Sequence, residues 1–320
     1  MEDHSEYSPN LNIIVPLFNE EENFDDLILR LKKILNESKI DIEVILIDDG
    51  STDNTSSKMR ELSLQNEKFQ SVFLSRNFGH QLALSAGLSY VNAKEAVLII
   101  DGDLQDPPEM IGKFYDLFKE GYDVVYAIRK NRKSSILLKG AYHIFYRIMK
   151  RFSYINIPLD SGDFSLISRR VVEHLNSMPE ESRFLRGMRS WVGFKQIGIP
   201  YSRDEREKGE SKYNLLNLIS LALNGLINFS KYPIRFTMTV GIISLIISFI
   251  YFIITLYKKV FIGDVPIGFT ALLFAIIMFG GLQLIAIGVI GEYILRIFFQ
   301  VKKRPLFIVK ERIQNCEKMQ

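Results

Sequence analysis

Cysteine is almost absent from this sequence of 320 residues, in which Cys316 is the only one. A single cysteine excludes an intramolecular disulfide and a metal site built from several thiolates, and it favours a reducing compartment. The sequence also has no large excess of charge of one sign. Its 40 Lys and Arg residues are nearly balanced by 37 Asp and Glu residues, which gives a net charge of +3. Without a global positive field, we expect no nucleic-acid partner.

Glycine-rich phosphate loops are also missing. Neither GxGxxG nor GxxxxGK(S/T) occurs, which argues against a dinucleotide-dependent oxidoreductase and against a P-loop NTPase. The N-terminal stretch MEDHSEYSPN has no basic start followed by an apolar run. We therefore expect no signal peptide.

Long stretches without charge lie in the last third of the sequence. The stretch from Phe236 to Tyr257 is uncharged and would be about 33 Å long as a helix, enough to cross a hydrocarbon core of ~30 Å. A second stretch, from Val265 to Gly291, has Gln283 as its only strongly polar side chain. Buried helices of a soluble core rarely need such long uncharged runs, so we predict two membrane spans, at about 236–257 and 266–291.

Basic residues are more frequent outside these two stretches than in the short link between them. Lys231 and Arg235 precede the first stretch, and Arg296 and the run 302–304 follow the second. The positive-inside rule then places both ends of an integral membrane protein in the cytoplasm. The expected organisation is a cytoplasmic domain at 1–212, a juxtamembrane helix at 213–231, the two spans within 232–300, and a basic cytoplasmic tail at 301–320.

Short apolar runs alternate with helical patterns before residue 130. The run from Leu11 to Val15 ends at Pro16, and Glu20 to Leu35 has apolar residues at helical spacing. Further strands are predicted at 43–47, 71–74, 96–100 and 123–127, and helices near 54–65, 80–92 and 108–119. This alternation predicts an α/β fold with a doubly wound, mostly parallel sheet, whose ligands bind at the carboxyl ends of the strands.

Acidic side chains gather where the predicted strands end. Asp48 and Asp49 follow the second strand, and Asp101 and Asp103 follow the fourth. Side chains at i and i+2 of a strand share a face, so Asp101 and Asp103 can direct two carboxylates to one point. Carboxylate oxygens suit Mg²⁺ or Mn²⁺, which keep open positions for substrate phosphates. The alternative is a pair of ordinary turns with helix-capping acids.

Five motifs occur together in this order: VPLFNEEE at 15–22, IDDGSTD at 47–53, RNFG at 76–79, DGDLQDPPE at 101–109 and GDF at 162–164. In this combination the sequence resembles the inverting family 2 glycosyltransferases. It is most similar to the polyisoprenyl-phosphate branch, which contains dolichol-phosphate mannose synthases and bacterial bactoprenol glucosyltransferases. The resemblance covers nearly the whole chain and implies a GT-A type, Rossmann-like fold followed by interfacial helices and two spans.

The resemblance also implies roles for individual residues. The residues at the positions that hold the nucleobase and nucleotide are Pro16, Phe18, Glu20, Ile47, Asp49 and Asp101. Phe18 replaces a more common tyrosine, which removes a hydroxyl contact but keeps the aromatic face. Asp101, Asp103 and Gln105 match the positions that coordinate the metal ion, and Asp163 matches an acid placed near the acceptor.

The reaction implied is displacement at the anomeric carbon of a hexose-type sugar, with a nucleoside diphosphate leaving. A phosphate monoester acceptor has a second pKa near 6 and needs no base at neutral pH. We therefore expect Asp163 to position the acceptor or a basic side chain, with a residual general-base role left open. A simple capping role is the structural alternative.

Local clusters of basic residues could bind a lipid phosphate. Arg129 and Arg132 follow the fifth predicted strand, and the forked guanidinium group suits phosphate. Arg129 is a catalytic candidate together with Asp103 and Asp163. The resemblance further implies a mobile loop that closes over the site and contains Arg206, Ser211 and Lys212, although simple solvation of this polar loop is the alternative.

Two segments look suited to a bilayer surface. Residues 134–152 carry basic side chains every four positions opposite apolar ones, which predicts either a basic amphipathic helix on an anionic membrane or a helix packed on the sheet. Residues 213–231 carry three asparagines along one side, which favours an interfacial helix over a third span. Glycines at 280, 281, 288 and 291 allow close helix contacts, compatible with a homo-oligomer.

Taken together, these features predict a membrane-anchored, metal-dependent glycosyltransferase. It would move a hexose from a nucleotide sugar, with UDP as the expected carrier, to polyprenyl phosphate at the cytoplasmic leaflet, for modification of cell-envelope glycans. One alternative is transfer to another lipid or to a polysaccharide. An alternative of a different class is a membrane scaffold that binds the sugar nucleotide without turnover.

Overall fold

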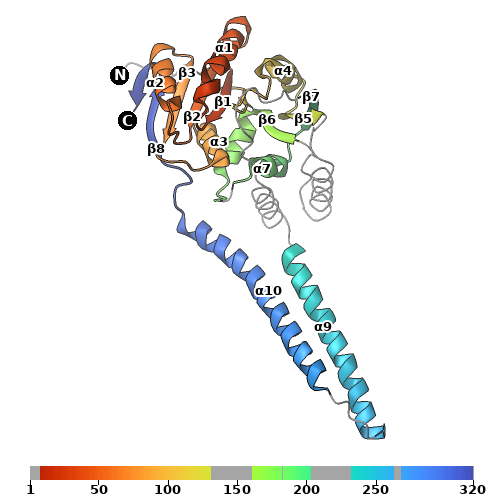
Figure 1. Cartoon of the computed structure of the whole chain (residues 1–320). Coiled ribbons are helices and arrows are strands. Elements are labelled where there is room, and N and C mark those ends of the chain that lie inside the picture. Colours follow the sequence, from red (N-terminus) through yellow and green to blue (C-terminus); the bar gives the residue numbers. More distant parts are fainter. Residues whose placement is uncertain (1–7, 131–160, 182, 203–231, 263–267, 320) are drawn as a thin grey trace. The chain divides into compact units, whose positions relative to one another are not determined.

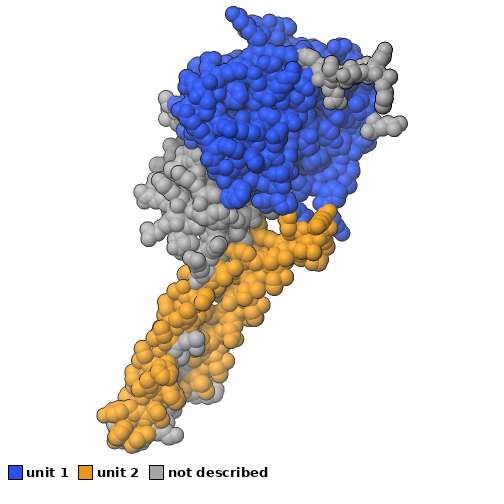
Figure 2. Space-filling view, turned by 180° about the vertical axis from the view of Figure 1, so that it is seen from behind, with its two compact units in different colours: residues 1–150, 155–218, 304–320 blue, residues 151–154, 219–303 orange. Residues whose placement is uncertain are grey.

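The computed structural model describes residues 8–130, 161–181, 183–202, 232–262 and 268–319. The described chain forms two compact units (Figure 2). Unit 1 contains residues 1–150, 155–218 and 304–320, and unit 2 contains residues 151–154 and 219–303. The predicted helices at 134–152 and 213–231 lie outside the described residues.

The centre of unit 1 is a parallel sheet made of β1 (Leu11–Leu17), β2 (Ile42–Asp48), β3 (Phe69–Leu74) and β4 (Ala96–Ile99). Leu11 pairs with both Ile42 and Ala96, so β1 lies between β2 and β4. Every residue of these four strands is buried. Strands buried on both faces are nearly continuous apolar runs, which is why the sequence pattern located them.

The outer strands make the sheet mixed. They are β5 (Val124–Lys130), β6 (Ser161–Ser168), β7 (Gln196–Ser202), β8 (Val309–Gln314) and β9 (Glu317–Met319). The strand order is β7-β5-β6-β4-β1-β2-β3-β8-β9. β6 runs antiparallel to both β4 and β5, and β8 runs antiparallel to β3. The α/β fold is confirmed, but the sheet is parallel only at its centre and between β5 and β7.

Helices cover both faces of the sheet (Figure 1). Helices α1 (Glu21–Glu37), α2 (Thr55–Gln65) and α4 (Ile111–Lys119) bury apolar side chains in one core with Ile13 and Val15 of β1. Ile14 of β1 points to the other face, against α3 (His80–Ser89). The helices α6 (Arg169–Ser177) and α7 (Leu185–Val192) pack beside α3, and a short 3₁₀ turn, η1 (Pro108–Met110), precedes α4. This two-faced arrangement is the doubly wound topology that the alternation predicted.

The C-terminal segment is part of the sheet of unit 1, a feature that sequence analysis missed. Residues 301–320 were expected to form a basic tail, yet β8 extends the sheet beside β3, and Ile313 is fully buried there. Arg60 of α2 forms an ion pair of 2.8 Å with Glu311 of β8. The segment is short and rich in charge, so its composition resembles that of a solvated tail.

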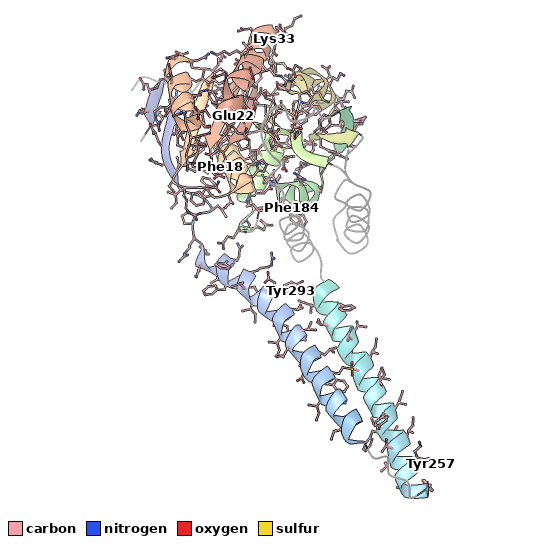
Figure 3. The ribbon with its side chains drawn as sticks, viewed as in Figure 1. Phe18, Glu22, Lys33, Phe184, Tyr257 and Tyr293 are labelled. Atoms are coloured by element: carbon pink, nitrogen blue, oxygen red, sulfur yellow. The ribbon has the colours of Figure 1, made fainter. Side chains whose placement is uncertain are left out.

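Unit 2 is made of α9 (Tyr232–Tyr257), a π-helical turn η2 (Lys258–Ile262) and α10 (Phe269–Lys302). Among the residues that the structure describes, two helical segments are long and apolar enough to cross a membrane, Phe236–Tyr257 and Met278–Lys302. Figure 3 labels Tyr257 at the end of α9 and Tyr293 in α10. The first segment has the predicted bounds, whereas α10 continues beyond residue 291 to Lys302, and Glu292 and Arg296 form an i,i+4 ion pair of 3.1 Å in this extension.

Candidate active site

Hydrogen bonds between backbone amides and side chains join the loop after β1 to the loop after β2. The backbone amide of Asn19 donates to Ser51 Oγ at 3.0 Å, and the amide of Thr52 donates to Asn19 Oδ1 at 2.8 Å. Asp53 accepts hydrogen bonds from the amides of Glu21 and Thr55, at the starts of α1 and α2. Asp53 therefore caps the starts of both helices, and these hydrogen bonds keep the carboxyl ends of β1 and β2 together.

Asp49 anchors the loop that leads into α3. Its carboxylate accepts hydrogen bonds from the amides of Phe78 and Gly79, at 2.8 and 2.9 Å. Burial raises the pKa of Asp49 even though these two hydrogen bonds favour the ionised form. Gly79 has φ of +97°, a conformation that favours glycine, and α3 begins at the next residue, His80.

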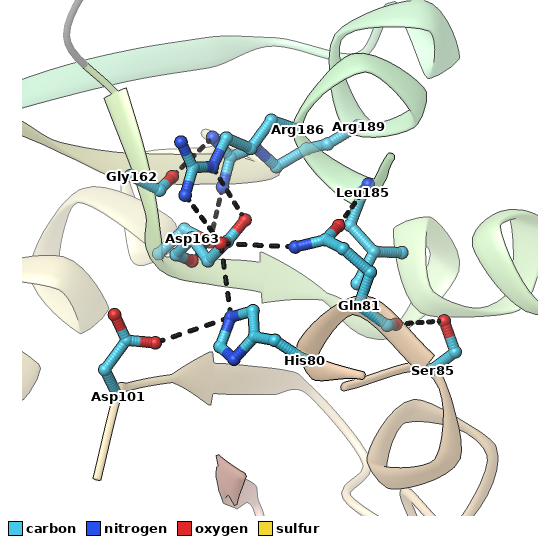
Figure 4. A network of polar contacts seen from close by, with 10 residues as sticks. His80, Gln81, Ser85, Asp101, Gly162, Asp163, Leu185, Arg186 and Arg189 are labelled. Atoms are coloured by element: carbon cyan, nitrogen blue, oxygen red, sulfur yellow. Dashed lines mark hydrogen bonds and ion pairs between the residues drawn. The ribbon is translucent and has the colours of Figure 1, made fainter. Parts of the chain in front are cut away.

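His80 lies between two carboxylates from neighbouring strands (Figure 4). Its Nε2 is 3.4 Å from Asp163 Oδ2 and 3.6 Å from Asp101 Oδ1. Burial opposes the charged imidazolium, but the hydrogen bond to Asp163 and the charge of Asp101 outweigh it and raise the pKa of His80 to about 9. Asp101 follows β4 and Asp163 lies near the start of antiparallel β6, so the sheet brings both to the same edge.

Asp163 is the most heavily paired acid of the site. Its Oδ1 accepts from Nε of Arg186 at 2.9 Å, and its Oδ2 accepts from Nη2 of the same residue at 2.7 Å. Gln81 Nε2 donates to Oδ2 at 3.4 Å. The side chain is only 4% exposed, and although burial opposes ionisation, Arg186 and His80 hold the pKa of Asp163 well below its usual range. Asp163 is therefore a fixed anion at neutral pH.

Helix α7 presents two arginines to this region. Arg186 contacts Asp163, while the more deeply buried Arg189 donates to Ser165 Oγ at 2.6 Å and to the carbonyl of Gly162 at 3.4 Å. Burial lowers the pKa of Arg189 to about 10, so its guanidinium keeps its charge at neutral pH. Gln81 Oε1 accepts from the amide of Leu185 at 2.9 Å, which ties the first turn of α7 to α3.

Contacts from α1, from β7 and within the loop itself hold the loop that carries Asp101 and Asp103. Tyr201 of β7 donates to the buried carboxylate of Asp106 at 2.6 Å. Arg30 of α1 reaches the carbonyl of Leu104 at 3.4 Å and forms an ion pair with Glu109 at 2.7 Å. Leu104 has φ of +61°, and Asp103 Oδ1 accepts from the amide of Gln105 at 3.2 Å. The loop is thus a defined turn.

The predicted metal residues do not form a closed cage of acids. Within the part of the chain that the structure describes, no three His, Cys, Asp or Glu side chains are arranged to hold a metal ion. Asp101 faces His80, and Asp103 caps its own turn. Their oxygens suit a hard cation, and such an ion commonly takes its remaining ligands from water and substrate phosphates. The donor types therefore fit Mg²⁺ or Mn²⁺, and the metal role of Asp101, Asp103 and Gln105 stays a prediction.

The predicted nucleobase residues lie at the carboxyl ends of β1 and β2, in two different environments. Phe18 is partly exposed beside the start of α1 (Figure 3), and Glu20 Oε2 accepts from Asn23 Nδ2 at 2.6 Å. Pro16 is buried within β1, and Ile47 is fully buried beneath α3. Phe18 is thus partly exposed and the Ile47 side chain is fully buried, and the nucleotide-binding roles of all these residues stay predictions.

Of the residues predicted to bind the lipid phosphate or to form the lid, Arg129 belongs to the described sheet. Arg129 lies in β5, where it pairs with Tyr201 of β7 in the sheet register. The remaining lipid-phosphate and lid residues, Arg132, Arg206, Ser211 and Lys212, lie outside the described residues. Their roles stay predictions.

Sequence reasoning missed His80, Gln81 and Arg186. The RNFG motif ends one residue before His80, so a polar side chain opening a helix after a strand was the available signal. No comparable signal marked Arg186, because its contact with Asp163 joins β6 to α7 across a distance that only the folded chain closes.

Comparison with known proteins gives consistent results over nearly the whole chain. A family model described as Glycosyl transferase family 2 matches residues 12–175. The uncharacterized glycosyltransferase YkcC of Bacillus subtilis (strain 168) is 40% identical over 312 residues, which cover 97% of this chain and 95% of the relative. The bactoprenol glucosyl transferase of Shigella phage SfX is 36% identical over 303 residues, 94% of this chain and 99% of the relative.

Among solved structures, a mannosyltransferase from Pyrobaculum calidifontis in complex with GDP-Man and Mn²⁺ is 17% identical with a TM-score of 0.43. The match covers 64% of this chain and 59% of that one, less than two thirds of its length.

Proposed function

Because the chain belongs to glycosyl transferase family 2, we propose that it transfers a hexose from a nucleotide sugar to polyprenyl phosphate. The similarity to a bactoprenol glucosyl transferase over 94% of this chain makes glucose the first sugar to test. The observation that carries the proposal is the pair Asp101 and Asp163, which β4 and β6 bring to one edge of the sheet with His80 between them. In this proposal Asp101 would serve the donor and Asp163 the acceptor.

The state of Asp163 supports an acceptor that needs no base. A carboxylate whose pKa lies well below its usual range is a poor proton acceptor near neutral pH. A phosphate monoester with a second pKa near 6 is already mostly dianionic there and can attack the anomeric carbon without losing a proton. Asp163 would then orient the groups around the acceptor, as the sequence interpretation favoured.

The donor would lie at the carboxyl ends of β1, β2 and β4. Phe18 offers an aromatic face to the base, and Asp49 and Glu20 border the same edge of the sheet. Asp101, Asp103 and Gln105 would hold a divalent ion, which would stabilise the negative charge of the departing diphosphate. Mg²⁺ and Mn²⁺ both suit these oxygen donors. For the lipid phosphate, Arg129, Arg132 and the loop with Arg206, Ser211 and Lys212 remain the sequence-based candidates.

The sheet supports the proposed membrane topology. β7 precedes α9 and β8 follows α10, yet both strands belong to the same sheet of unit 1. One sheet lies on one side of a membrane, so the chain between β7 and β8 would cross an even number of times. Two crossings by α9 and α10 satisfy this condition, and the flanking basic residues favour the cytoplasmic side for unit 1.

The proposal is tested with the full chain in membranes, undecaprenyl phosphate and a panel of labelled nucleotide sugars, with Mg²⁺ or Mn²⁺. We expect one labelled sugar to enter the lipid fraction, and we expect Asp101→Asn and Asp103→Asn each to reduce transfer by about 100-fold or more. Arg170→Gln, on a surface arginine of α6, is the control that should keep full activity.

The other outcomes identify the alternatives. If the labelled sugar entered a polysaccharide, or a lipid other than polyprenyl phosphate, that molecule would be identified as the acceptor. Binding of a nucleotide sugar without turnover, unchanged by Asp103→Asn, would identify a scaffold instead of an enzyme.

A further inference from the structure

His80, the first residue of α3, presents an accessible imidazole at the carboxyl edge of the sheet. Its side chain is 41% exposed, compared with 23% for Asp101 and 4% for Asp163 beside it. The Nε2 atom faces Oδ1 of Asp101 at 3.6 Å and Oδ2 of Asp163 at 3.4 Å (Figure 4). The ring therefore lies between the two acids while part of its surface stays accessible.

The backbone of His80 is held in place from two directions. Asp49 accepts hydrogen bonds from the amides of Phe78 and Gly79, the two residues that precede His80. The carbonyl of Gly79 accepts from the amide of Ala83 in the first turn of α3. A side chain whose backbone is fixed in this way can contact a substrate at a defined position.

The polar side chains next to His80 bind one another. Arg186 donates to both oxygens of Asp163. Gln81 donates to Asp163 through Nε2 and accepts from the amide of Leu185 through Oε1. The Nδ1 atom of His80, in contrast, forms no hydrogen bond with any residue that the structure describes. This nitrogen can accept from a hydroxyl group when the ring is neutral and donate to one when the ring is charged, so His80 can bind a hydroxyl in either charge state.

The proposed reaction determines what must lie beside this ring. In a displacement at the anomeric carbon, the attacking and leaving oxygens lie on opposite sides of that carbon. The proposed function assigns the donor diphosphate to Asp101 and the acceptor to Asp163, so the transferred sugar lies between them, where His80 is located. A hexose carries several hydroxyl groups and no charge, which suits a hydrogen-bonding side chain better than a further ion pair.

We propose that His80 contacts the transferred hexose, that it binds one hydroxyl group of this sugar through Nδ1, and that the contact contributes to the choice of sugar. This inference rests on the proposed function, because it assumes a nucleotide sugar at Asp101 and an acceptor at Asp163. A site that forms a hydrogen bond with a substrate hydroxyl discriminates against an analogue that lacks it, since the protein atom is then left unpaired. His80 is thus a specificity-determining residue of the transfer reaction.

The test compares the wild-type full chain with His80→Gln and His80→Asn, in membranes with polyprenyl phosphate. The donors are the nucleotide sugar that the wild type transfers, with UDP-glucose tested first, and analogues that each lack one hydroxyl group of the sugar. For one of these analogues, kcat/KM of the wild type should be lower by about 10-fold or more. In His80→Gln, this analogue and the parent donor should differ by less than about twofold, while the other analogues keep their wild-type ratios.

The two variants separate the contact with the sugar from the contact with the acids. The amide nitrogen of glutamine takes a position like that of Nε2, whereas the amide nitrogen of asparagine corresponds to Nδ1. His80→Asn should therefore retain part of the discrimination that His80→Gln loses. Each result is a ratio between two donors on one preparation, so a loss of folded protein cancels. His174→Gln, on an exposed side chain of α6, is the matched control and should keep every ratio.

The outcomes distinguish this inference from the function on which it rests. Wild-type protein that transfers no sugar to polyprenyl phosphate from any donor would refute the proposed function. If the wild type transfers sugar and His80→Gln keeps the wild-type ratio for every analogue, His80 does not contact the sugar and the function still stands. Discrimination that is kept in His80→Gln and lost in His80→Asn would also overturn the inference, because the bridge between Asp101 and Asp163 would then be the role of His80.

Discussion

At the scale of single residues, the chemistry of the site depends on ion pairs whose partners come from different elements. Asp163 comes from β6, Arg186 from α7 and His80 from α3. Arg186 and His80 hold the pKa of Asp163 well below its usual range, so this carboxylate stays ionised. Asp163 and Asp101 in turn raise the pKa of His80 to about 9. The site is therefore organised by fixed charges instead of by a residue poised to exchange a proton.

The pH dependence of transfer tests this conclusion. Because the pKa of Asp163 is held well below its usual range, this carboxylate stays ionised from about pH 5 to 8 and should contribute no acid limb there. The acceptor phosphate should contribute one near pH 6. We expect Asp163→Asn to lower kcat/KM by about 10-fold or more and to keep that acid limb, measured as lipid-linked product against pH. If the acid limb disappeared in Asp163→Asn, Asp163 would be the general base.

Tyr201 should affect Asp101 and Asp103 indirectly, through its hydrogen bond to Asp106 in the same loop. Tyr201→Phe removes the hydroxyl that donates to the buried Asp106, at a cost of about 1–3 kcal/mol in the free energy of unfolding. Because Asp106 follows Asp101 and Asp103 in one turn, we expect a weaker apparent affinity for Mg²⁺ or Mn²⁺ in the transfer assay. Tyr115→Phe, which breaks a similar tyrosine–carboxylate bond to Glu95 away from this turn, should leave the metal requirement unchanged.

At the scale of elements, α3 is positioned by how closely it packs on the sheet. Gly87 faces β1 and β2, and a Cβ at this position would come within 2.7 Å of Ile14 Cγ2 and 2.8 Å of Ile47 Cδ1. The absence of a side chain lets the helix approach, and this approach sets the depth of His80 and Gln81 at the other end of α3. Fine placement of the site thus depends on a small residue in a helix interior.

Two glycine variants separate helix propensity from packing. Gly87→Ala should lower the free energy of unfolding by about 1–3 kcal/mol because the methyl group overlaps two isoleucines, although alanine favours helices by ~1 kcal/mol. Gly112→Ala in α4 has open space around the new Cβ and should stabilise by up to about 1 kcal/mol. Thermal unfolding of the full chain in detergent measures both. Equal stabilisation by the two variants would contradict the packing argument.

The ion pair between α2 and β8 should give a pH-dependent stability. Hydrogen bonds from Arg60 and Lys318 outweigh burial and lower the pKa of Glu311 from 4.5 to about 2. Its contribution is then fully present above pH 4.5 and is lost as the pH falls toward 2. With partial exposure of Arg60 taken into account, we expect Glu311→Gln to cost about 1–2 kcal/mol near pH 7 and roughly half as much near pH 3.

Unfolding temperatures of wild type and Glu311→Gln at the two pH values provide the measurement. Glu37→Gln, on an exposed side chain at the end of α1, should change stability by less than about 0.5 kcal/mol at either pH. A difference between wild type and Glu311→Gln that grows on acidification would show that the pair is not the source of the stability.

At the scale of the whole molecule, the last strands of the sheet, β8 and β9, follow the two long helices in the chain. Unit 1 is built from residues on both sides of unit 2, and β8 pairs with β3 although their paired residues lie far apart in the sequence, for example Val72 and Arg312, which are 240 positions apart. The long apolar helices therefore form an insertion within the catalytic unit. For a two-span protein, this connectivity requires unit 1 and the C-terminal hairpin to share one side of the membrane.

The single cysteine provides a direct test of this topology. Cys316 lies in the turn between β8 and β9 and is partly exposed. We expect a membrane-impermeant maleimide to label it in inverted vesicles and not in intact cells. Lys258→Cys in a Cys316→Ser background, located between the two spans, should show the opposite pattern. Labelling of Cys316 in intact cells would exclude the proposed orientation.

The sequence alone was sufficient for the features that depend on local periodicity and composition. Apolar runs and helical spacing located β1 to β5 and α1 to α4 within a few residues, and uncharged length located the two long helices, because each of these patterns is complete within one segment. The motif IDDGSTD marked the correct loop, although it did not reveal that Asp53 caps two helices while Asp49 fastens the approach to His80.

Only the tertiary structure decided which residues meet. The pairing of Asp163 with Arg186, the placement of His80 between Asp101 and Asp163, and the return of β8 to the sheet each join segments separated in the chain. None has a local signature, because the free energy that selects them comes from packing, charge pairing and strand pairing across the whole unit, and these terms exist only once the chain has folded.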